Sequence, residues 1–302
     1  MNDLETRHTE ELLMPNGESE LRLIYQDESM VIIDKPSGLM THKSRIAEDN
    51  EYSAMERLRD QIGAWVYPVH RLDRATSGAL VFGKDQESAR ALHQAFANGA
   101  VHKRYWAVTR GHAPESEEID RPLKEKRDRI TDRNADQNKA PQEAKTSVKT
   151  LAHCVIPVAL GRYPSARFSL VDLSPKTGRR HQLRRHLAGI NYPIIGDTTH
   201  GRGEQNRFFR DQFLCDRLLL AAVGINLPHP KSGQGINLEV PLSGVMSAVC
   251  RRLFLDEKTQ AQSLHSAHSY DIGILKSSLG ISSLTWLSDR REHLHLFAVD
   301  QA

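Results

Sequence analysis

The chain has 302 residues, of which 39% are hydrophobic and 26% are charged, with a formal net charge of +3 at pH 7. This composition is typical of a soluble globular protein, and the length suffices for one large domain or two of modest size. Three widely separated cysteines exclude a disulfide framework and a Cys-x-x-Cys metal site, and no apolar run reaches the roughly eighteen residues of a membrane span. The polar amino terminus lacks the apolar core of a signal peptide, so we expect a cytoplasmic protein with no membrane contact.

The first half of the chain alternates short apolar runs with breaks. Residues 1–18 are expected to form an amino-terminal extension, and the apolar runs 21–25 and 30–33 predict a hairpin. Lys35-Pro36-Ser37-Gly38 interrupts this pattern, and apolar residues three to four apart then predict an amphipathic helix over 53–62. The next expected elements are a strand at 65–69, a strand at 78–83, a helix at 85–98 and a strand at 105–109.

The second half contains a long polar interruption before the pattern resumes. Residues 122–141 are highly charged with few large apolar side chains, which indicates a solvent-exposed excursion. A basic helix is predicted to begin at Gly178 and to end near Gly189. The other expected elements are strands at 146–151, 168–173, 217–227 and 236–240 and a helix at 242–255.

Many strands with segregated helices favour an α+β fold, with a largely antiparallel mixed β-sheet core and flanking helices and loops. We expect one domain over 19–256, followed by an appendage of unknown role at 257–302, which is rich in serine and histidine. The histidines of this appendage are not spaced with cysteines or carboxylates as in a structural metal site, so no metal is expected.

The segment from His70 to Gly78 places one carboxylate, Asp73, between Arg71 and Arg74. Opposite charge nearby favours the ionised carboxylate, and the Thr-Ser-Gly that follows predicts a tight turn. A fixed carboxylate beside arginines is typical of nucleophilic or electrostatic catalysis on an anionic substrate. An ion-paired surface turn has the same composition, so this segment alone does not decide between the two.

Two further segments carry basic and aromatic residues. Lys103-Arg104-Tyr105 opens a predicted strand, and a tyrosine there is suited either to the core or to stacking on a base. Between Lys176 and His186 the chain has five lysines or arginines, two histidines and no acidic residue. Such a cluster indicates either phosphate contacts or a solvated helix face.

Taken together, these segments resemble the RluA family of pseudouridine synthases, which isomerise uridine within RNA. The motifs are His-Arg-Leu-Asp-x-x-Thr-Ser-Gly, Lys-x-Tyr and Thr-Gly-Arg-x-His-Gln-Leu-Arg, in the family's order, and the resemblance spans roughly residues 20 to 255. It implies that Asp73 is the catalytic carboxylate, that Tyr105 packs against the target uracil and that Arg184 pairs with Asp73. The resemblance also implies RNA contacts for other motif residues, namely Arg71 at the site of the extruded base, His70, Thr76, Lys103, Arg179 and His181.

The implied reaction breaks the bond from C1′ to N1, turns the uracil and joins C5 to C1′, so that no cofactor is needed. Asp73 would add to C1′, add to C6 or remove the proton at C2′, and the sequence does not separate these routes. Pro193 to Gly201 resembles the branch of the family that modifies uridine 65 of tRNA, while ribosomal RNA, or both RNAs, remain alternative substrates.

A non-catalytic RNA-binding protein is the contrasting interpretation. A paired-carboxylate glycosidase is a third, although the sequence shows no second acid near Asp73. We expect a monomer.

Overall fold

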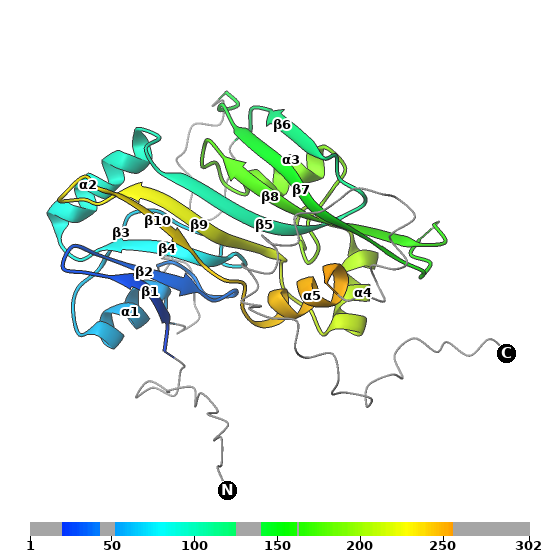
Figure 1. Ribbon diagram of the computed structural model, residues 1–302, viewed down its shortest axis with the longest axis horizontal. Helices are drawn as coiled ribbons and strands as arrows, with labels where there is room; N and C mark the ends of the chain where they lie inside the picture. Colours follow the sequence, from blue (N-terminus) through cyan, green and yellow to red (C-terminus); the bar gives the residue numbers. More distant parts are fainter. Residues whose placement is uncertain (1–19, 43–51, 125–139, 162, 256–302) are drawn as a thin grey trace, which may run out of the picture.

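The structure is a computed structural model that describes residues 20–42, 52–124, 140–161 and 163–255 (Figure 1). The expectations for 1–18, for 257–302 and for most of the charged excursion at 122–141 lie outside these residues. None of the helices in the described part of the chain has the length and apolar character needed to cross a membrane.

The described residues form a mixed sheet with helices on both of its faces. The strands are β1 (Arg22–Gln26), β2 (Met30–Lys35), β3 (Tyr67–Pro68), β4 (Ser77–Gly83), β5 (His102–Arg110), β6 (Ser116–Asp120), β7 (Lys145–Ile156), β8 (Ala166–Pro175), β9 (Leu220–Pro228) and β10 (Gly235–Glu239). The helices are α1 (Ala54–Ile62), α2 (Gln86–Ala97), α3 (Gln182–Gly189), α4 (Gly203–Phe213) and α5 (Gly244–Phe254).

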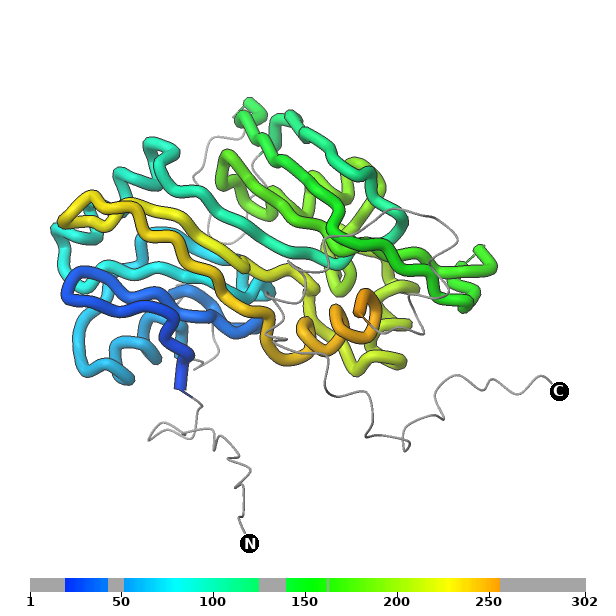
Figure 2. Tube along the Cα trace, in the orientation of Figure 1, coloured from blue at the N-terminus to red at the C-terminus, as the bar shows by residue number. Residues whose placement is uncertain are grey.

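The strands lie in the order β1-β2-β4-β9-β5-β8-β7-β6, with β3 beside β4 and β10 beside β9. Every pairing is antiparallel except the short parallel contact between β4 and β9. In Figure 2 the blue and cyan amino-terminal strands lie at one side of the sheet and the green strands at the other. The predicted α+β class with a largely antiparallel sheet is confirmed.

Local signals predicted most elements correctly. The hairpin of β1 and β2 is confirmed, and α1 begins at a capping box in which Ser53 and Glu56 satisfy each other's backbone N–H groups. Two elements were not predicted. Strand β6 has a single buried apolar residue, Ile119, because it lies at the sheet edge, and α4 begins at Gly203 without a side-chain cap.

The two faces of the sheet carry separate apolar clusters, because successive side chains of a strand point to opposite sides. On β5, Tyr105 and Ala107 belong to the cluster that includes α1, α2 and α3 residues. Trp106 and Val108 belong to the cluster covered by α4 and α5. Helix α3, with its basic motif, therefore lies on the same face of the sheet as Tyr105.

The two halves of the sheet meet at Gly78, where β4 contacts β9. Gly78 has φ +103°, in the left-handed region, and a Cβ atom there would overlap the carbonyl oxygen of Ala222. This close backbone approach explains why the residue that ends the His70–Gly78 segment is glycine.

Replacing Gly78 by Ala is expected to lower the free energy of unfolding by on the order of 3 kcal/mol, because it adds backbone strain to a clash with backbone atoms. Denaturant unfolding measures this loss. Gly235→Ala is the matched control, since a Cβ there meets no atom within 4 Å, and it should shift stability by about 0.5 kcal/mol or less. Equal stability of the two variants would contradict this account of the sheet junction.

Candidate active site

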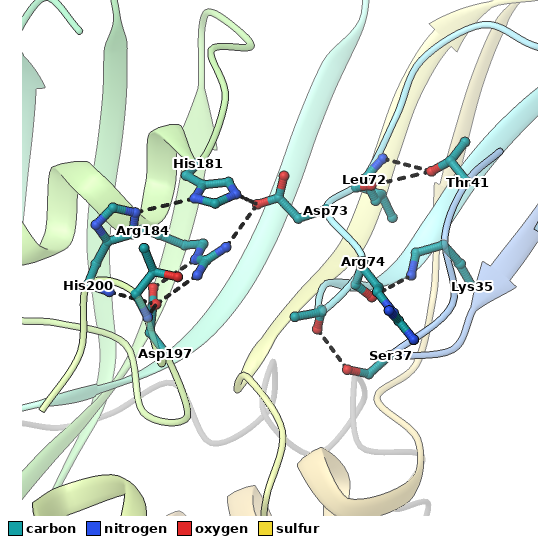
Figure 3. Close-up of polar contacts among 12 residues, drawn as sticks. Lys35, Ser37, Thr41, Leu72, Asp73, Arg74, His181, Arg184, Asp197 and His200 are labelled. Carbon is teal, nitrogen blue, oxygen red and sulfur yellow. Dashed lines mark hydrogen bonds and ion pairs between the residues drawn. The ribbon is translucent and has the colours of Figure 1, made fainter. Parts of the chain in front are cut away.

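Asp73 lies in the loop between β3 and β4. This loop leads into Gly78, where β4 contacts β9 and the two halves of the sheet meet. The Asp73 carbonyl oxygen accepts a hydrogen bond from the Thr76 N–H at 2.9 Å, so the turn spans Asp73 to Thr76. The turn was predicted at Thr-Ser-Gly, but Ser77 and Gly78 already belong to β4, where Gly78 pairs with β9. The Asp73 side chain is 22% exposed, so the carboxylate is accessible but surrounded by protein groups. Figure 3 shows it pointing toward side chains from α3 and the loop that precedes it.

The end of β2 and the segment that follows it hold the backbone of this loop from the side opposite α3 (Figure 3). Side chains and one backbone N–H of these residues donate hydrogen bonds to carbonyl oxygens on both sides of Asp73. These bonds run from Lys35 Nζ to Arg74 O (3.2 Å), from Gly38 N to Arg74 O (2.8 Å), from Ser37 Oγ to Ala75 O (2.7 Å) and from Thr41 Oγ1 to Leu72 O (3.3 Å). The position of Asp73 is therefore fixed through its neighbours in the chain.

Lys35 is fully buried, which is rare for a lysine. Its ammonium group donates to Pro36 O at 2.8 Å and Leu39 O at 2.7 Å as well as to Arg74 O. Burial, together with the positive charge of Arg217, lowers the pKa of Lys35 to about 7. Three carbonyl partners use all three N–H donors of the charged form.

The titration of Lys35 predicts a pH dependence of stability. Its pKa is lower in the folded protein than in the unfolded chain, so the unfolded chain binds more protons between pH 7 and about 10.5. Stability should therefore rise with pH across this range, by at most about 1.4 kcal/mol per pH unit, relative to Lys35→Met. Denaturant unfolding of both proteins from pH 6 to 9.5 measures the difference. A difference that does not change with pH would contradict the assigned pKa.

Two side chains from the third motif face the Asp73 carboxylate (Figure 3). Arg184 Nη1 lies 3.5 Å and His181 Nε2 lies 3.9 Å from Asp73 Oδ2. The shorter bonds of Arg184 go to a second carboxylate, Asp197, which accepts from Nε and Nη2 at 2.7 Å each. The predicted contact between Arg184 and Asp73 is present, but the bidentate partner of the guanidinium is Asp197.

His181 is uncharged at neutral pH. Burial lowers its pKa to about 4, although the nearby Asp73 carboxylate acts in the opposite direction. Its Nδ1 lies 3.3 Å from His200 Nε2. Arg184 is therefore the side chain that places a positive charge beside Asp73.

Helix α3 begins at Gln182, four residues later than predicted from Gly178. His181 adopts the left-handed conformation with φ 53°, and the Gln182 side chain holds the preceding turn. Gln182 Oε1 accepts from Thr177 Oγ1 at 2.7 Å and from the Arg179 N–H at 3.0 Å. This turn directs His181 toward Asp73, and a regular helix through these residues would not provide it.

Tyr105 is buried on β5, close enough to Asp73 for the carboxylate to affect its titration. Burial, and to a smaller extent the Asp73 charge, raise the pKa of Tyr105 well above its ordinary value. Strand β5 has a bulge against β9 between Arg104 and Tyr105, which shifts the register at this residue. The raised pKa keeps the Tyr105 hydroxyl protonated and neutral.

The other residues predicted to contact RNA differ in their exposure and in their hydrogen-bond partners. Lys103 Nζ lies 3.4 Å from the carbonyl of Thr177, and the guanidinium of Arg179 donates to Glu143 O at 3.0 Å. Arg71 is exposed, and Thr76 is buried. Their contacts with RNA remain predictions.

His70 is held by packing within the protein. Its ring stacks on Phe96 with the ring centroids 4.6 Å apart, and its Nε2 accepts from the Val81 N–H at 3.0 Å. Burial lowers the pKa of His70 to about 3, in keeping with an acceptor nitrogen. This geometry joins the start of the Asp73 loop to β4, and the predicted RNA contact of His70 remains untested.

Four residues of the site were not predicted as such: Lys35, Thr41, Asp197 and His200. The break at Lys35 and the Asp197–His200 segment were visible in the sequence, but no local spacing showed that the fold joins them to Asp73.

The glycosidase alternative requires a second carboxylate, which the sequence does not show near Asp73. The fold supplies one, Asp197, but it is only 1% exposed. Burial would raise its pKa, yet hydrogen bonds from Arg184 and two backbone N–H groups hold it below its ordinary value. Asp197 therefore lacks the access and the proton that a glycosidase acid needs.

Comparison with known proteins identifies the fold and the family. Residues 29–189 match the family model for RNA pseudouridylate synthase. The chain is 47% identical over 231 residues to "tRNA pseudouridine synthase C" of Pectobacterium carotovorum subsp. carotovorum, covering 75% of this chain and 61% of that protein. It is 43% identical to the protein of that name from Vibrio cholerae, covering 74% of this chain and 92% of the relative.

Among solved structures, "Human RNA Pseudouridylate Synthase Domain Containing 1" has the same fold, with a TM-score of 0.59 at 23% identity over 83% of this chain and 97% of the human one. The motifs around Asp73, Tyr105 and Arg184 were identified by their resemblance to the RluA family, and the family model covers all three. The chain therefore belongs to the RluA family of RNA pseudouridylate synthases.

Proposed function

We propose that this protein converts uridine 65 of tRNA to pseudouridine, with Asp73 as the catalytic carboxylate. Family membership defines the reaction class, an isomerisation of uridine in RNA. One observation supports the role of Asp73 above the others. Of the two carboxylates that contact Arg184, Asp73 is accessible at 22% exposure, whereas Asp197 is enclosed. A group that acts on a bound nucleotide has to reach it.

The reaction breaks the C1′–N1 bond and forms a C1′–C5 bond, while C5 loses a proton and N1 gains one. No electrons are gained or lost overall. Each route considered for Asp73, namely addition to C1′, addition to C6 or removal of the C2′ proton, uses a carboxylate held close to the sugar. Arg184 and the loop contacts on the opposite side supply that fixed position.

Tyr105 is proposed to stack on the target uracil. The face of the ring suits any pyrimidine, and a base–aromatic stack stabilises binding by about 1–3 kcal/mol. Its raised pKa keeps the hydroxyl protonated, so the oxygen is a poor base for the C5 proton.

Replacing Tyr105 by Phe is therefore expected to keep the rate of the chemical step within about tenfold of the wild type. Proton transfer through the hydroxyl would instead cost about 10²- to 10⁴-fold. Single-turnover kinetics with saturating enzyme measures this step, and Tyr105→Ala serves as the comparison that removes the ring. A loss in Tyr105→Phe as large as in Tyr105→Ala would contradict the stacking role.

The tRNA substrate is proposed from the relatives that carry the name tRNA pseudouridine synthase C. Exposed or half-buried basic residues lie within or next to the three motifs, and they suit the phosphates of an RNA stem, whose base edges are hidden. They are Arg71, Arg74, Lys103, Arg179, Arg180 and Arg185. We also propose that residues 19–256 form the catalytic domain.

Carbodiimide mapping of pseudouridine tests the substrate assignment. Unmodified tRNA and ribosomal RNA transcripts are incubated with the wild type or with Asp73→Ala, without added cofactor. We expect a reverse-transcription stop at tRNA position 65 that requires Asp73. A stop in ribosomal RNA alone would retain the chemistry and reject the tRNA assignment, and the absence of any stop would favour an RNA-binding protein without catalysis.

A further inference from the structure

Asp197 lies behind the arginine that faces Asp73, in the loop between α3 and α4. It accepts from Nε and Nη2 of Arg184, which leaves Nη1 directed toward Asp73 at 3.5 Å. A guanidinium is planar, so two bonds to one carboxylate fix the direction of its third nitrogen. Arg184 alone, on a flexible side chain, would not be oriented in this way.

The same carboxylate shapes the loop that carries His200. Its Oδ1 accepts from the backbone N–H groups of Thr199 at 2.8 Å and His200 at 2.9 Å. The His200 ring then contacts His181, whose other nitrogen faces Asp73. Asp197 thus supports both side chains that approach Asp73 from the α3 side.

The backbone around Asp197 is itself held in place independently of Arg184. The Asn206 side chain accepts from the Gly196 N–H at 2.8 Å and donates to the Asp197 carbonyl at 3.0 Å. Gly196 has φ +79°, and a Cβ there would overlap the carbonyl oxygen of Arg217. The loop is therefore a rigid base for the contacts that Asp197 makes.

We infer that Asp197 is a positioning residue, which orients Arg184 and, through His200, His181 toward Asp73 without touching the RNA. This inference rests on the proposed catalytic role of Asp73. The competing interpretation is that the Arg184–Asp197 pair serves stability only. The two interpretations differ in kinetics, because a displaced partner of the reacting group lowers kcat and leaves the binding of the RNA unchanged.

The test compares Asp197→Asn with a matched control, Asp172→Asn. Asp172 also accepts from an arginine, Arg104 Nε at 2.6 Å, and from Trp106 Nε1 at 3.1 Å. Trp106 belongs to the opposite face of the sheet from Tyr105. We expect Asp197→Asn to lower kcat by about 100-fold with KM for tRNA changed less than about threefold, and Asp172→Asn to keep kcat within about threefold.

A wild-type kcat in Asp197→Asn, a change in KM alone, or an equal fall in kcat in both variants would overturn the inference. If Asp197→Asn does not fold, replacement of the half-buried His200 tests the inference instead. A kcat about tenfold lower in His200→Ala supports the inference, and an unchanged kcat overturns it.

Asp73→Asn in the same assay separates the catalytic role proposed for Asp73 from the positioning role inferred for Asp197. Full activity of that variant would reject the proposed function, whereas an inactive Asp73→Asn with a fully active Asp197→Asn would reject only the positioning role.

Discussion

Replacing Asp73 by Asn is expected to lower pseudouridine formation by about 10⁴-fold or more, the effect typical of removing a group that acts directly in the chemical step. Asn has the same shape and lacks the charge that every route for Asp73 requires. Nucleoside analysis of RNA digested after incubation measures the product. Arg184 keeps its bidentate partner Asp197, so the fold should not depend on the Asp73 charge.

The affinity of Asp73→Asn for tRNA should stay within about threefold of the wild type, since phosphate contacts dominate RNA binding and the basic residues are unchanged. Fluorescence anisotropy with labelled tRNA measures it at a stated salt concentration. Asp172→Asn provides the control for loss of a carboxylate elsewhere on the sheet. Joint collapse of affinity and activity would show that Asp73 is needed for the structure of the binding surface and would contradict a specific role in chemistry.

Replacing Arg184 by Met should have the largest effect on stability. The guanidinium is buried between two carboxylates, and its loss leaves Asp197 without its charged partner. Breaking a buried pair from one side typically costs about 3–5 kcal/mol. We also expect kcat to fall by at least about 100-fold, because Asp73 loses its oriented partner.

The neighbouring Arg185 offers a matched control in the same helix. It is half-buried, and burial lowers its pKa, in contrast to Arg184, whose pKa is raised mainly through Asp197 against the effect of burial. Arg185→Met should cost about 1 kcal/mol or less. Arg185 is among the proposed phosphate contacts, so its replacement is expected to act on KM and not on kcat. Equal losses of stability and of kcat in both variants, measured by denaturant unfolding and by kinetics at saturating tRNA, would contradict the assignment of Arg184.

A double variant gives a further check on the cause of the stability loss. If the cost of Arg184→Met comes from an unpaired buried charge, then Arg184→Met combined with Asp197→Leu should be less destabilised than the sum of the single variants. Additive losses would indicate that packing, and not charge, explains the effect.

Those parts of the site that depend on local sequence could be predicted. Thr-Ser-Gly predicted a turn in the Asp73 segment, but the structure has the turn earlier, from Asp73 to Thr76. Tyr105 was placed on a strand by its apolar neighbours, and it lies on β5. The motif resemblance placed Arg184 beside Asp73, and the structure has the two 3.5 Å apart. Each of these predictions used a short segment or a known motif, and the structure has Tyr105 and Arg184 where they were placed.

The long-range parts of the site could not be predicted in this way. Nothing near Asp197 shows that its carboxylate binds Arg184, because the pairing arises only when the loop after α3 folds back. The buried position of Lys35 could not be predicted for a related reason: three carbonyls, one of them from Arg74 in the Asp73 loop, compensate its burial only in the folded chain. Helix α3 began later than predicted because the Gln182 side chain stabilises a turn where helix propensity alone favours a helix.

Release of tritium from tRNA labelled at C5 of its uridines tests the central claim most directly, because C5 loses its hydrogen when it becomes bonded to C1′. The measurement uses single-turnover conditions, with the wild type and Asp73→Asn at equal fractions of bound RNA, and a second tRNA with cytidine at position 65. The account predicts release equivalent to one uridine with the wild type, and none with Asp73→Asn or with the cytidine transcript. Release by Asp73→Asn at the wild-type rate would contradict the catalytic role of this carboxylate, and undiminished release from the cytidine transcript would contradict the target.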